Sequence, residues 1–252
     1  MVEGDMPSAE KIERFLISFY QAPRGEPTSV VSRLALVLLH PVMTGAAIRY
    51  IIKLPVVVVP ISKSDGSAVP WLYDPRRPWN LRGFMSSYIE LPSPLDLYWR
   101  GQAKQNLRKA TARARMAGFK VRLVDSSETS SVVARVFADK GWDTEGIEAM
   151  QRTLRESRDN DFCVAVFDEF EHPVAFCIGA QAGIAVRNVW ANASQKGQVR
   201  WLCFSGFVEE ASERGAKYIV ESPPWAMSEG NRVFAQRLGF VPVRIRSELS
   251  RR

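Results

Sequence analysis

Apolar residues in the first sixty positions follow helical spacing and then give way to a strand. After Ser8, apolar side chains recur at three- and four-residue intervals, which predicts a capped helix over residues 8–24. The segment "KLPVVVVPIS" contains a valine run bracketed by Pro55 and Pro60, and this composition favours a buried strand. A loop-rich connection rich in Pro, Gly and Asn is expected to follow.

The most apolar segment of the chain runs from Leu34 to Ile48 and is interrupted by His40 and Pro41. It is shorter than the roughly 20 residues that a membrane-spanning helix needs. Two interpretations remain open. The first, which we favour, is a buried pair of helices broken at Pro41, and the second is a surface that docks on a membrane.

A helix rich in basic residues is predicted from Pro94 to residue 117. Ser93 and Pro94 are typical of a helix start, and Gly118 is typical of the position just past a helix end. Residues 98–123 carry eight cations and no acid: Arg100, Lys104, Arg108, Lys109, Arg113, Arg115, Lys120 and Arg122. With no acid after Asp96, the helix forgoes nearly every i, i+4 ion pair, and its charge has little local role in stability. We therefore expect contact with phosphates of tRNA, CoA or an anionic lipid surface. The alternative is a merely solvated face.

From Asp161 onward the pattern changes from helical to strand-like. Three apolar segments, at 161–168, 173–181 and 184–194, are separated by short turns, so three consecutive antiparallel strands are expected. After them the sequence predicts a helix, a strand, a second helix and a last strand, at residues 198–216, 217–222, 227–239 and 240–249.

Composition limits the size of the hydrophobic core and indicates the charge of a binding partner. With 252 residues and 46% hydrophobic content, the chain can bury one large core or two modest ones. Its 34 basic and 27 acidic residues give a net charge of +7, which favours anionic partners. The three cysteines lack C-x-x-C spacing and are expected to be reduced core thiols, with no metal. The N-terminus lacks the pattern of a signal peptide, so a cytoplasmic location is expected.

The order of elements over residues 161–249 resembles the C-terminal part of the GNAT acyltransferase fold. "FVEEASERGAKYIVES" looks like the central helix of that superfamily passing into the next strand, and "SEGNRVFAQRLGFVPVR" looks like its closing helix and strand. The preceding basic helix, "NLRKATARARMAGFKVRL", is similar to that of the Fem-type peptidoglycan-bridge aminoacyltransferases, which use aminoacyl-tRNA.

This resemblance implies an α/β fold with a GNAT-like mixed, mostly antiparallel sheet flanked by helices. Residues 1–92 would form an N-terminal region, either partly GNAT-like or helical and loop-rich. Residues 93–252 would form the acyltransferase domain, including the basic helix 94–117.

The resemblance also implies a phosphate-bearing donor, either acyl-CoA or aminoacyl-tRNA. GNAT enzymes hold the CoA pyrophosphate on a turn at the start of the central helix, where the helix dipole favours an anion. The chain has "SQKGQVRW" there, which keeps one glycine and a cation but lacks the second small residue, so both donors stay open. The expected phosphate-binding residues are Gln195, Lys196, Gly197, Gln198 and Arg200 on this turn, and Lys104, Arg108 and Arg113 on the basic helix.

Acyl transfer to an amine needs a polarised carbonyl and a base for the amine. In the GNAT arrangement the backbone of a bulged strand polarises the carbonyl, so the N–H groups of residues 190–194 and the amide of Asn192 are the expected donors. Glu221, at the end of its strand, is the expected base, because partial burial there could raise its pKa. The alternative is that Glu221 only bonds the turn that follows it. The other candidate bases are Asp143, Glu145 and His172.

Aromatic and amide side chains near these elements are expected to line a substrate cleft: Trp190, Trp225, Asn231 and Phe234. A core position is the alternative for Trp190, whereas Trp225 lies on a loop, where packing explains a tryptophan less well. Many GNAT enzymes protonate the leaving thiolate with a tyrosine at the position of Ala235, which offers no hydroxyl.

The sequence therefore predicts an N-acyltransferase or aminoacyltransferase that acts on an amine. The alternative is a non-catalytic GNAT-fold module that binds nucleic acid or an anionic membrane surface.

Overall fold

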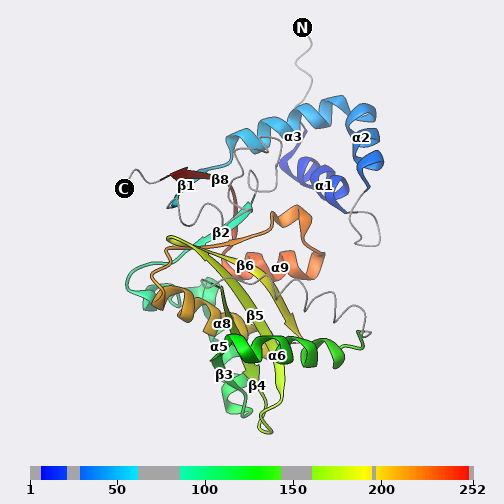
Figure 1. Ribbon diagram of the computed structural model, residues 1–252. Coiled ribbons are helices and arrows are strands. Elements are labelled where there is room, and N and C mark those ends of the chain that lie inside the picture. Colours follow the sequence, from blue (N-terminus) through cyan, green and yellow to red (C-terminus); the bar gives the residue numbers. More distant parts are fainter. Residues whose placement is uncertain (1–6, 22–28, 62–85, 143–160, 195–196, 250–252) are drawn as a thin grey trace. The chain divides into compact units, whose positions relative to one another are not determined.

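The computed structural model describes residues 7–21, 29–61, 86–142, 161–194 and 197–249 (Figure 1). The chain forms two compact units assembled from segments that are distant in sequence. Unit 1 comprises Met1–Val58, Trp71–Ser87 and Ser222–Arg246, and unit 2 comprises Val59–Pro70, Tyr88–Glu221 and Ser247–Arg252. The last helix of the chain therefore belongs to the same unit as the N-terminal helices.

Unit 1 is built around three N-terminal helices. Ser8 begins the first of them, because its Oγ accepts a hydrogen bond from the backbone N–H of Lys11 (3.4 Å), as predicted. Ile12 and Leu16 bury the apolar face of this helix. The unit contains α1 (Ala9–Tyr20), α2 (Val30–Leu39), α3 (Pro41–Lys53), η3 (Pro224–Ala226) and α9 (Glu229–Leu238), and the neighbouring strands β1 (Val56–Ile61) and β8 (Val241–Leu249) begin in it.

Only part of the apolar segment is buried, so the expectation of a buried helix pair was wrong. The helices break between His40 and Pro41, as predicted, and Ala46 and Ala47 join the core beside α1. Leu36, Val37, Met43 and Ile51 are partly buried. Seven further apolar side chains of the two helices are exposed: Val31, Leu34, Leu38, Leu39, Val42, Ile48 and Ile52. Sequence periodicity identifies an apolar face, but it does not show whether another element covers that face.

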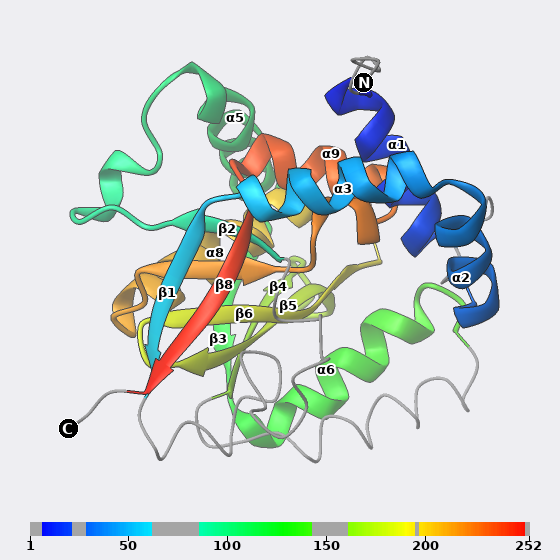
Figure 2. The same cartoon turned by 90° about the horizontal axis from the view of Figure 1, so that it is seen from above.

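Unit 2 is a mostly antiparallel sheet with helices on both faces (Figure 2). Its strands follow the order β2-β7-β6-β5-β4-β3, in which β3–β4, β4–β5 and β5–β6 are antiparallel and β6–β7 is parallel. The predicted fold class is confirmed. The strands are β2 (Ser86–Glu90), β3 (Lys120–Val124), β4 (Asp161–Phe167), β5 (Pro173–Ala182), β6 (Ala185–Ala193) and β7 (Tyr218–Glu221), and the helices are α5 (Gln105–Met116), α6 (Ser126–Ala138) and α8 (Gln198–Glu213). The sequence "DTEGIEAMQRTLRES", residues 143–157, also predicts a helix, but it lies outside the described residues.

Strand β4 shows how the two faces of the sheet are covered. Phe162 stacks on Phe207 of α8, with 5.3 Å between ring centroids, whereas the next residue, Cys163, joins Val133 of α6 in one core cluster. Since successive strand side chains point to opposite faces, α8 and α6 cover opposite faces of the sheet. Every residue of β4 after Asp161 is buried, which is why its sequence is a continuous apolar run.

The three cysteines lie in the core of unit 2. Cys163, Cys177 and Cys203 are free and buried, and the thiol of Cys203 lies 3.5 Å from the sulfur of Cys177. Burial raises the pKa of the Cys163 thiol to about 12, so this group stays protonated at neutral pH. The prediction of reduced core thiols is confirmed.

The basic helix is shorter than predicted. Two 3-10 turns, η1 (Leu95–Leu97) and η2 (Gln102–Lys104), precede α5, and Gly101 separates them with a φ of 84°. This left-handed conformation is open to glycine without steric cost, and it interrupts the helix that the spacing predicted. The helix end is as predicted, because Gly118 adopts a φ of 85° just beyond α5.

Candidate functional site

Strands β6 and β7 pair in parallel only over a short stretch. Their register begins with Ala185 opposite Tyr218 and ends with Arg187 opposite Val220, although β6 continues to Ala193. The later part of β6 therefore has β5 as its neighbour but no register partner on β7. This part of β6 therefore lies outside the β6–β7 ladder.

The pairing of β6 with β5 becomes irregular just beyond Arg187, where the pairing with β7 ends. Asn188 lies opposite Gly179 and Trp190 lies opposite Ile178, so Val189 has no partner in the register. This is the bulge that the resemblance to GNAT enzymes predicts for the strand before the central helix. A bulge turns backbone groups out of the ladder.

Three polar side chains meet where the strands part. The Nδ2 of Asn188 donates a hydrogen bond to a carboxylate oxygen of Glu221, the last residue of β7. Arg200, in the first turn of α8, is near enough for its charge to interact with that of Glu221. Burial lowers the pKa of the Arg200 guanidinium, and the charges of Cys177 and Glu221 act in the opposite direction. The arginine nevertheless stays protonated at neutral pH.

These contacts bring polar groups to the Glu221 carboxyl group: the amide of Asn188 donates a hydrogen bond to it, and its charge acts on Arg200. The site therefore combines a carboxyl group with an amide and a guanidinium.

Asn188 is a member of this site that the sequence analysis missed. Its side chain is 8% exposed, and its Oδ1 has no hydrogen-bond partner among the described residues. A buried acceptor left unpaired costs roughly 1–3 kcal/mol, so this oxygen is suited to accept a hydrogen bond from a bound N–H or O–H group. The available signal was a polar residue within the otherwise apolar segment "IAVRNVW".

Asn192 and the residues after it are already engaged within the protein. The Oδ1 of Asn192 accepts hydrogen bonds from the Nζ of Lys140 and from the backbone N–H of Ala193 (2.9 Å). The backbone N–H of Ser194 donates to the carbonyl oxygen of Val174 (2.8 Å). Of the backbone donors expected over 190–194, the last two thus hold the end of β6 in place.

The N-terminus of α8 lies next along the chain. Gly197 precedes the helix with a φ of 90°, and Gln198 is its first residue; both are exposed. A helix of this length carries partial positive charge at its N-terminus, and Arg200 adds a full charge in the first turn. Gln195 and Lys196 lie outside the described residues.

Two of the cations expected to bind phosphate have structural contacts instead. The Nζ of Lys104 lies 4.1 Å from the centroid of the Tyr98 ring. The guanidinium of Arg108 donates hydrogen bonds to the carbonyl oxygens of Trp99 and of Gly101 (3.0 Å for the latter). Both side chains thus stabilise the turns before α5, which corrects the expectation that the basic charge has little local role.

Lys104 gives a testable pH dependence of stability. Burial lowers its pKa from 10.5 to about 8. Between these values the unfolded chain binds more protons than the folded one, so the free energy of unfolding is expected to rise with pH over this window. Replacing Lys104 with methionine should remove this contribution. Urea unfolding of both proteins from pH 7 to pH 10.5 measures it, and a difference between them that stays constant with pH would contradict the assignment.

Two exposed cations of α5 remain available for phosphate. Lys109 and Arg113 are four residues apart, and neither has a partner within the described ranges. Residues at this spacing lie on the same side of a helix. Arg115, by contrast, lies 3.9 Å from Glu209. We therefore expect Lys109, which was not among the predicted binding residues, to act together with Arg113.

Three residues expected in the substrate cleft belong to unit 1. Trp225 is 2% exposed, and its ring centroid lies 6.3 Å from that of Tyr50, so core packing explains it, contrary to the sequence interpretation. Asn231 and Phe234 lie on α9, the first exposed and the second half-buried. The fourth, Trp190, lies on β6 in unit 2.

Of the other candidate bases, the structure describes only His172, and it lies apart from Glu221. His172 is exposed at the β4–β5 hairpin, where its backbone N–H donates to Oδ1 of Asp168 (2.8 Å). Asp143 and Glu145 lie outside the described residues. Among the residues the structure describes, no group of three or more His, Cys, Asp or Glu side chains is placed to hold a metal ion.

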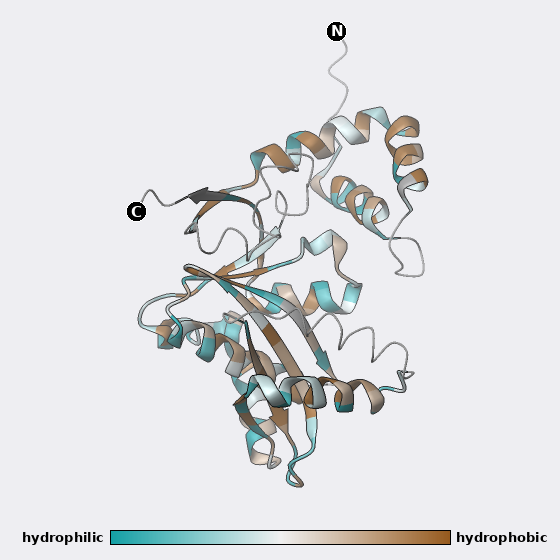
Figure 3. Cartoon of the chain, viewed as in Figure 1, coloured by the Kyte–Doolittle hydropathy of each residue, from teal (hydrophilic) through white to brown (hydrophobic). Residues whose placement is uncertain are grey.

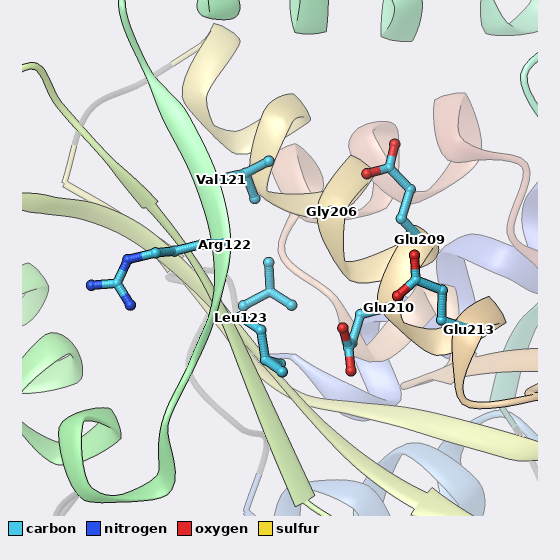
Figure 4. A pocket seen from close by; sticks show the side chains of 8 residues that line it. Val121, Arg122, Leu123, Gly206, Glu209, Glu210 and Glu213 are labelled. Atoms are coloured by element: carbon cyan, nitrogen blue, oxygen red, sulfur yellow. The ribbon is translucent and has the colours of Figure 1, made fainter.

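A pocket of about 140 Å³ lies elsewhere in unit 2, between β3 and the second half of α8 (Figure 4). Its acids are largely engaged, because Glu210 pairs with Arg214 (2.5 Å) and Glu209 accepts a hydrogen bond from the Oγ of Ser205 (3.4 Å). Burial raises the pKa of Glu209. The cation among its lining residues, Arg122, pairs with Glu128 (3.3 Å), and its side chain points away from the acids on the opposite wall.

No family model matches this sequence, and no similar curated protein is found. Among solved structures, the chain is similar to FemX (12% identity, TM-score 0.48, covering 63% of this chain and 59% of FemX). It is also similar to L-PGS from Bacillus licheniformis (14% identity, TM-score 0.46, 97% and 92% covered). A third similar structure is a GCN5-related N-acetyltransferase from Kribbella flavida (15% identity, TM-score 0.39, 64% and 55% covered).

The chain spans less than two thirds of FemX and of the Kribbella flavida protein. Since all three TM-scores are below 0.5, the functional assignment below rests on this chain's own topology and residues.

Proposed function

We propose that this protein transfers an acyl or aminoacyl group from a phosphate-bearing donor, acyl-CoA or aminoacyl-tRNA, to an amine. The observation that supports this most strongly is the meeting of Glu221, Asn188 and Arg200 where the parallel pairing of β6 and β7 ends. A carboxylate, a buried unpaired acceptor and a cation suit an amine nucleophile and an anionic donor.

In the proposed reaction, the bulged part of β6 receives the donor carbonyl. Backbone N–H groups near Val189 donate to the carbonyl oxygen and stabilise the oxyanion that forms there. Asn188 Oδ1 accepts a hydrogen bond from the attacking amine, which orients its lone pair.

The Glu221 carboxylate takes the proton from this amine. As the C–N bond forms and the donor C–S or C–O bond breaks, the electron pair leaves with the thiolate or ribose oxygen. That oxygen or sulfur then receives a proton from solvent. Glu221 returns to its carboxylate form by releasing its proton.

Two positive regions fit the phosphates of the donor. The N-terminus of α8 with Arg200 suits a pyrophosphate or a terminal phosphodiester. Lys109 and Arg113 on α5 suit a longer polyanion such as tRNA. A CoA donor needs only the first region, whereas a tRNA donor is expected to use both.

The proposal is tested by donor binding. In a thermal-shift measurement, acetyl-CoA is expected to raise the melting temperature if it is the donor, because a ligand that binds only the folded state stabilises it. In filter binding, charged tRNA is expected to bind more tightly than uncharged tRNA if tRNA carries the acyl group.

Alanine replacements at Lys109 and Arg113 separate the two donors. They should weaken tRNA binding, and the slope of the logarithm of the binding constant against the logarithm of salt concentration should fall by about one unit per lost phosphate contact. The rise in melting temperature with acetyl-CoA should stay unchanged. Lys217→Ala is the matched control, since Lys217 is exposed in the same unit and away from α5 in sequence. RNA binding without a preference for charged tRNA would favour the non-catalytic module. Absence of binding in both assays would contradict the proposed function.

A further inference from the structure

Helices α2 and α3 expose an apolar surface that unit 1 does not cover. Leu38, Leu39 and Val42 around the bend are 78%, 74% and 72% exposed, and this surface, here called the α2–α3 surface, continues through Leu34 and Ile48. Figure 3 shows α2 largely in the hydrophobic colour, whereas α3 alternates between hydrophobic and hydrophilic colours. Exposed apolar groups that are contiguous in this way typically mark an interaction site.

The opposite side of α3 already supplies the packing that the fold needs. Ala46 and Ala47 are buried with Ile12 and Leu16 of α1, whereas Val42, Ile48 and Ile52 follow helical spacing on the exposed side. Stability of the unit therefore does not account for the second apolar side. An exposed helix needs only one apolar stripe.

The charges beside this surface are positive. Residues 27–64 contain no Asp or Glu, and the exposed Arg49 and Lys53 lie on the same helix as Ile48 and Ile52. The acids of α1 have partners within the unit: Glu10 pairs with Arg14, and Glu13 accepts a hydrogen bond from the Tyr50 hydroxyl (3.2 Å). The surface thus combines apolar side chains with cations, which complements an anionic lipid surface.

The geometry of α2 and α3 fits a position on a membrane surface better than a position across the membrane. Among the described helices, none alone is long and apolar enough to span a membrane. Val31–Leu39 and Pro41–Lys53 reach the required length and apolarity only when taken together, and the pair is bent by 103°. Helices of ten and thirteen residues are about 15 and 20 Å long, less than the about 30 Å of a hydrocarbon core.

We propose that the α2–α3 surface docks this protein on an anionic lipid bilayer. Leu34, Leu38, Leu39 and Val42 enter the boundary between headgroups and acyl chains, and Arg49 and Lys53 contact lipid phosphates. A second copy of the chain is a poorer occupant, because a symmetric contact would place the cations of two copies near one another.

The test is vesicle co-sedimentation of the full chain. Wild-type protein is expected to bind mixed phosphatidylcholine and phosphatidylglycerol vesicles and to bind pure phosphatidylcholine much more weakly. Leu38→Gln combined with Val42→Gln removes apolar contact without changing charge, and it should weaken binding to the mixed vesicles about tenfold or more. Phe170→Gln is the matched control, because Phe170 is 71% exposed in the other unit, and it should bind as wild type does.

Charge reversal tests the proposed contact of the cations with lipid phosphates. Arg49→Glu with Lys53→Glu should weaken binding to the anionic vesicles, whereas Arg237→Glu, an exposed change on α9, should have at most a small effect. Circular dichroism checks that each variant folds. The proposal is overturned if wild type does not bind, if the glutamine variant binds as wild type does, or if light scattering finds a dimer that Leu38→Gln dissociates. Donor binding is measured separately, so either proposal can fail alone.

Discussion

Replacing Glu221 with glutamine is expected to lower the rate of acyl transfer by about 10²–10⁴-fold, the usual contribution of a general base. Glutamine keeps the size of the side chain and can still contact Asn188, but it cannot take a proton from the amine. Donor binding should change little, because Arg200 and the N-terminus of α8 are untouched. The measurement is the transfer rate with whichever donor binds, at saturating amine.

Two further variants separate catalysis from folding. Glu213→Gln removes an exposed carboxylate at the end of α8 and should leave the transfer rate unchanged. Asn188→Ala should raise the KM for the amine more than it lowers kcat, because Asn188 orients the nucleophile. A Glu221→Gln enzyme that turns over at the wild-type rate would show that Glu221 only supports the turn after β7.

Replacing Phe137 with alanine is expected to cost about 3–5 kcal/mol in the free energy of unfolding, as large-to-small changes in a core do. Phe137 is fully buried on α6, and its ring centroid lies 5.7 Å from that of Phe176 on β5. The side chain therefore joins α6 to the sheet. Urea unfolding followed by circular dichroism measures the change.

The matched control makes the same substitution on the surface. Phe170 is 71% exposed at the β4–β5 hairpin, so Phe170→Ala should stay within about 0.5 kcal/mol of wild type. Equal effects of the two substitutions would contradict the packing of α6 on this sheet.

The elements of unit 2 were largely predictable, because their signals are local. The continuous apolar run of β4 reflects burial on both faces, and Gly118 marks the end of α5 by a backbone conformation that glycine favours. Gly101 shows the limit of such reasoning. The alanine and leucine spacing around it fits a helix, and only its positive φ, set by the surrounding structure, ends that pattern.

Long-range contacts decide the features that the sequence did not predict. Trp225 follows two prolines on a loop, yet helices from the opposite end of the chain bury it. Likewise, the exposed side of α2 and α3 is as apolar as the buried side of a core helix, so its sequence does not reveal that it is exposed.

The candidate site was predictable only in part, because long-range contacts also decide which residues belong to it. Glu221 and Arg200 were chosen from their positions in a recognised order of elements, and the structure places their charges within interaction range. Asn188 was missed because its role depends on the register between β6 and β7, which brings residues 33 apart in sequence into contact.

Hydrogen exchange with and without donor tests the central claim most directly. Acetyl-CoA or charged tRNA, whichever binds, is predicted to slow exchange in the later part of β6 and the first turns of α8, residues 188–203. Donor binding that protects only other segments, such as β3 and the end of α8 around the acidic pocket, would contradict the assignment of this site.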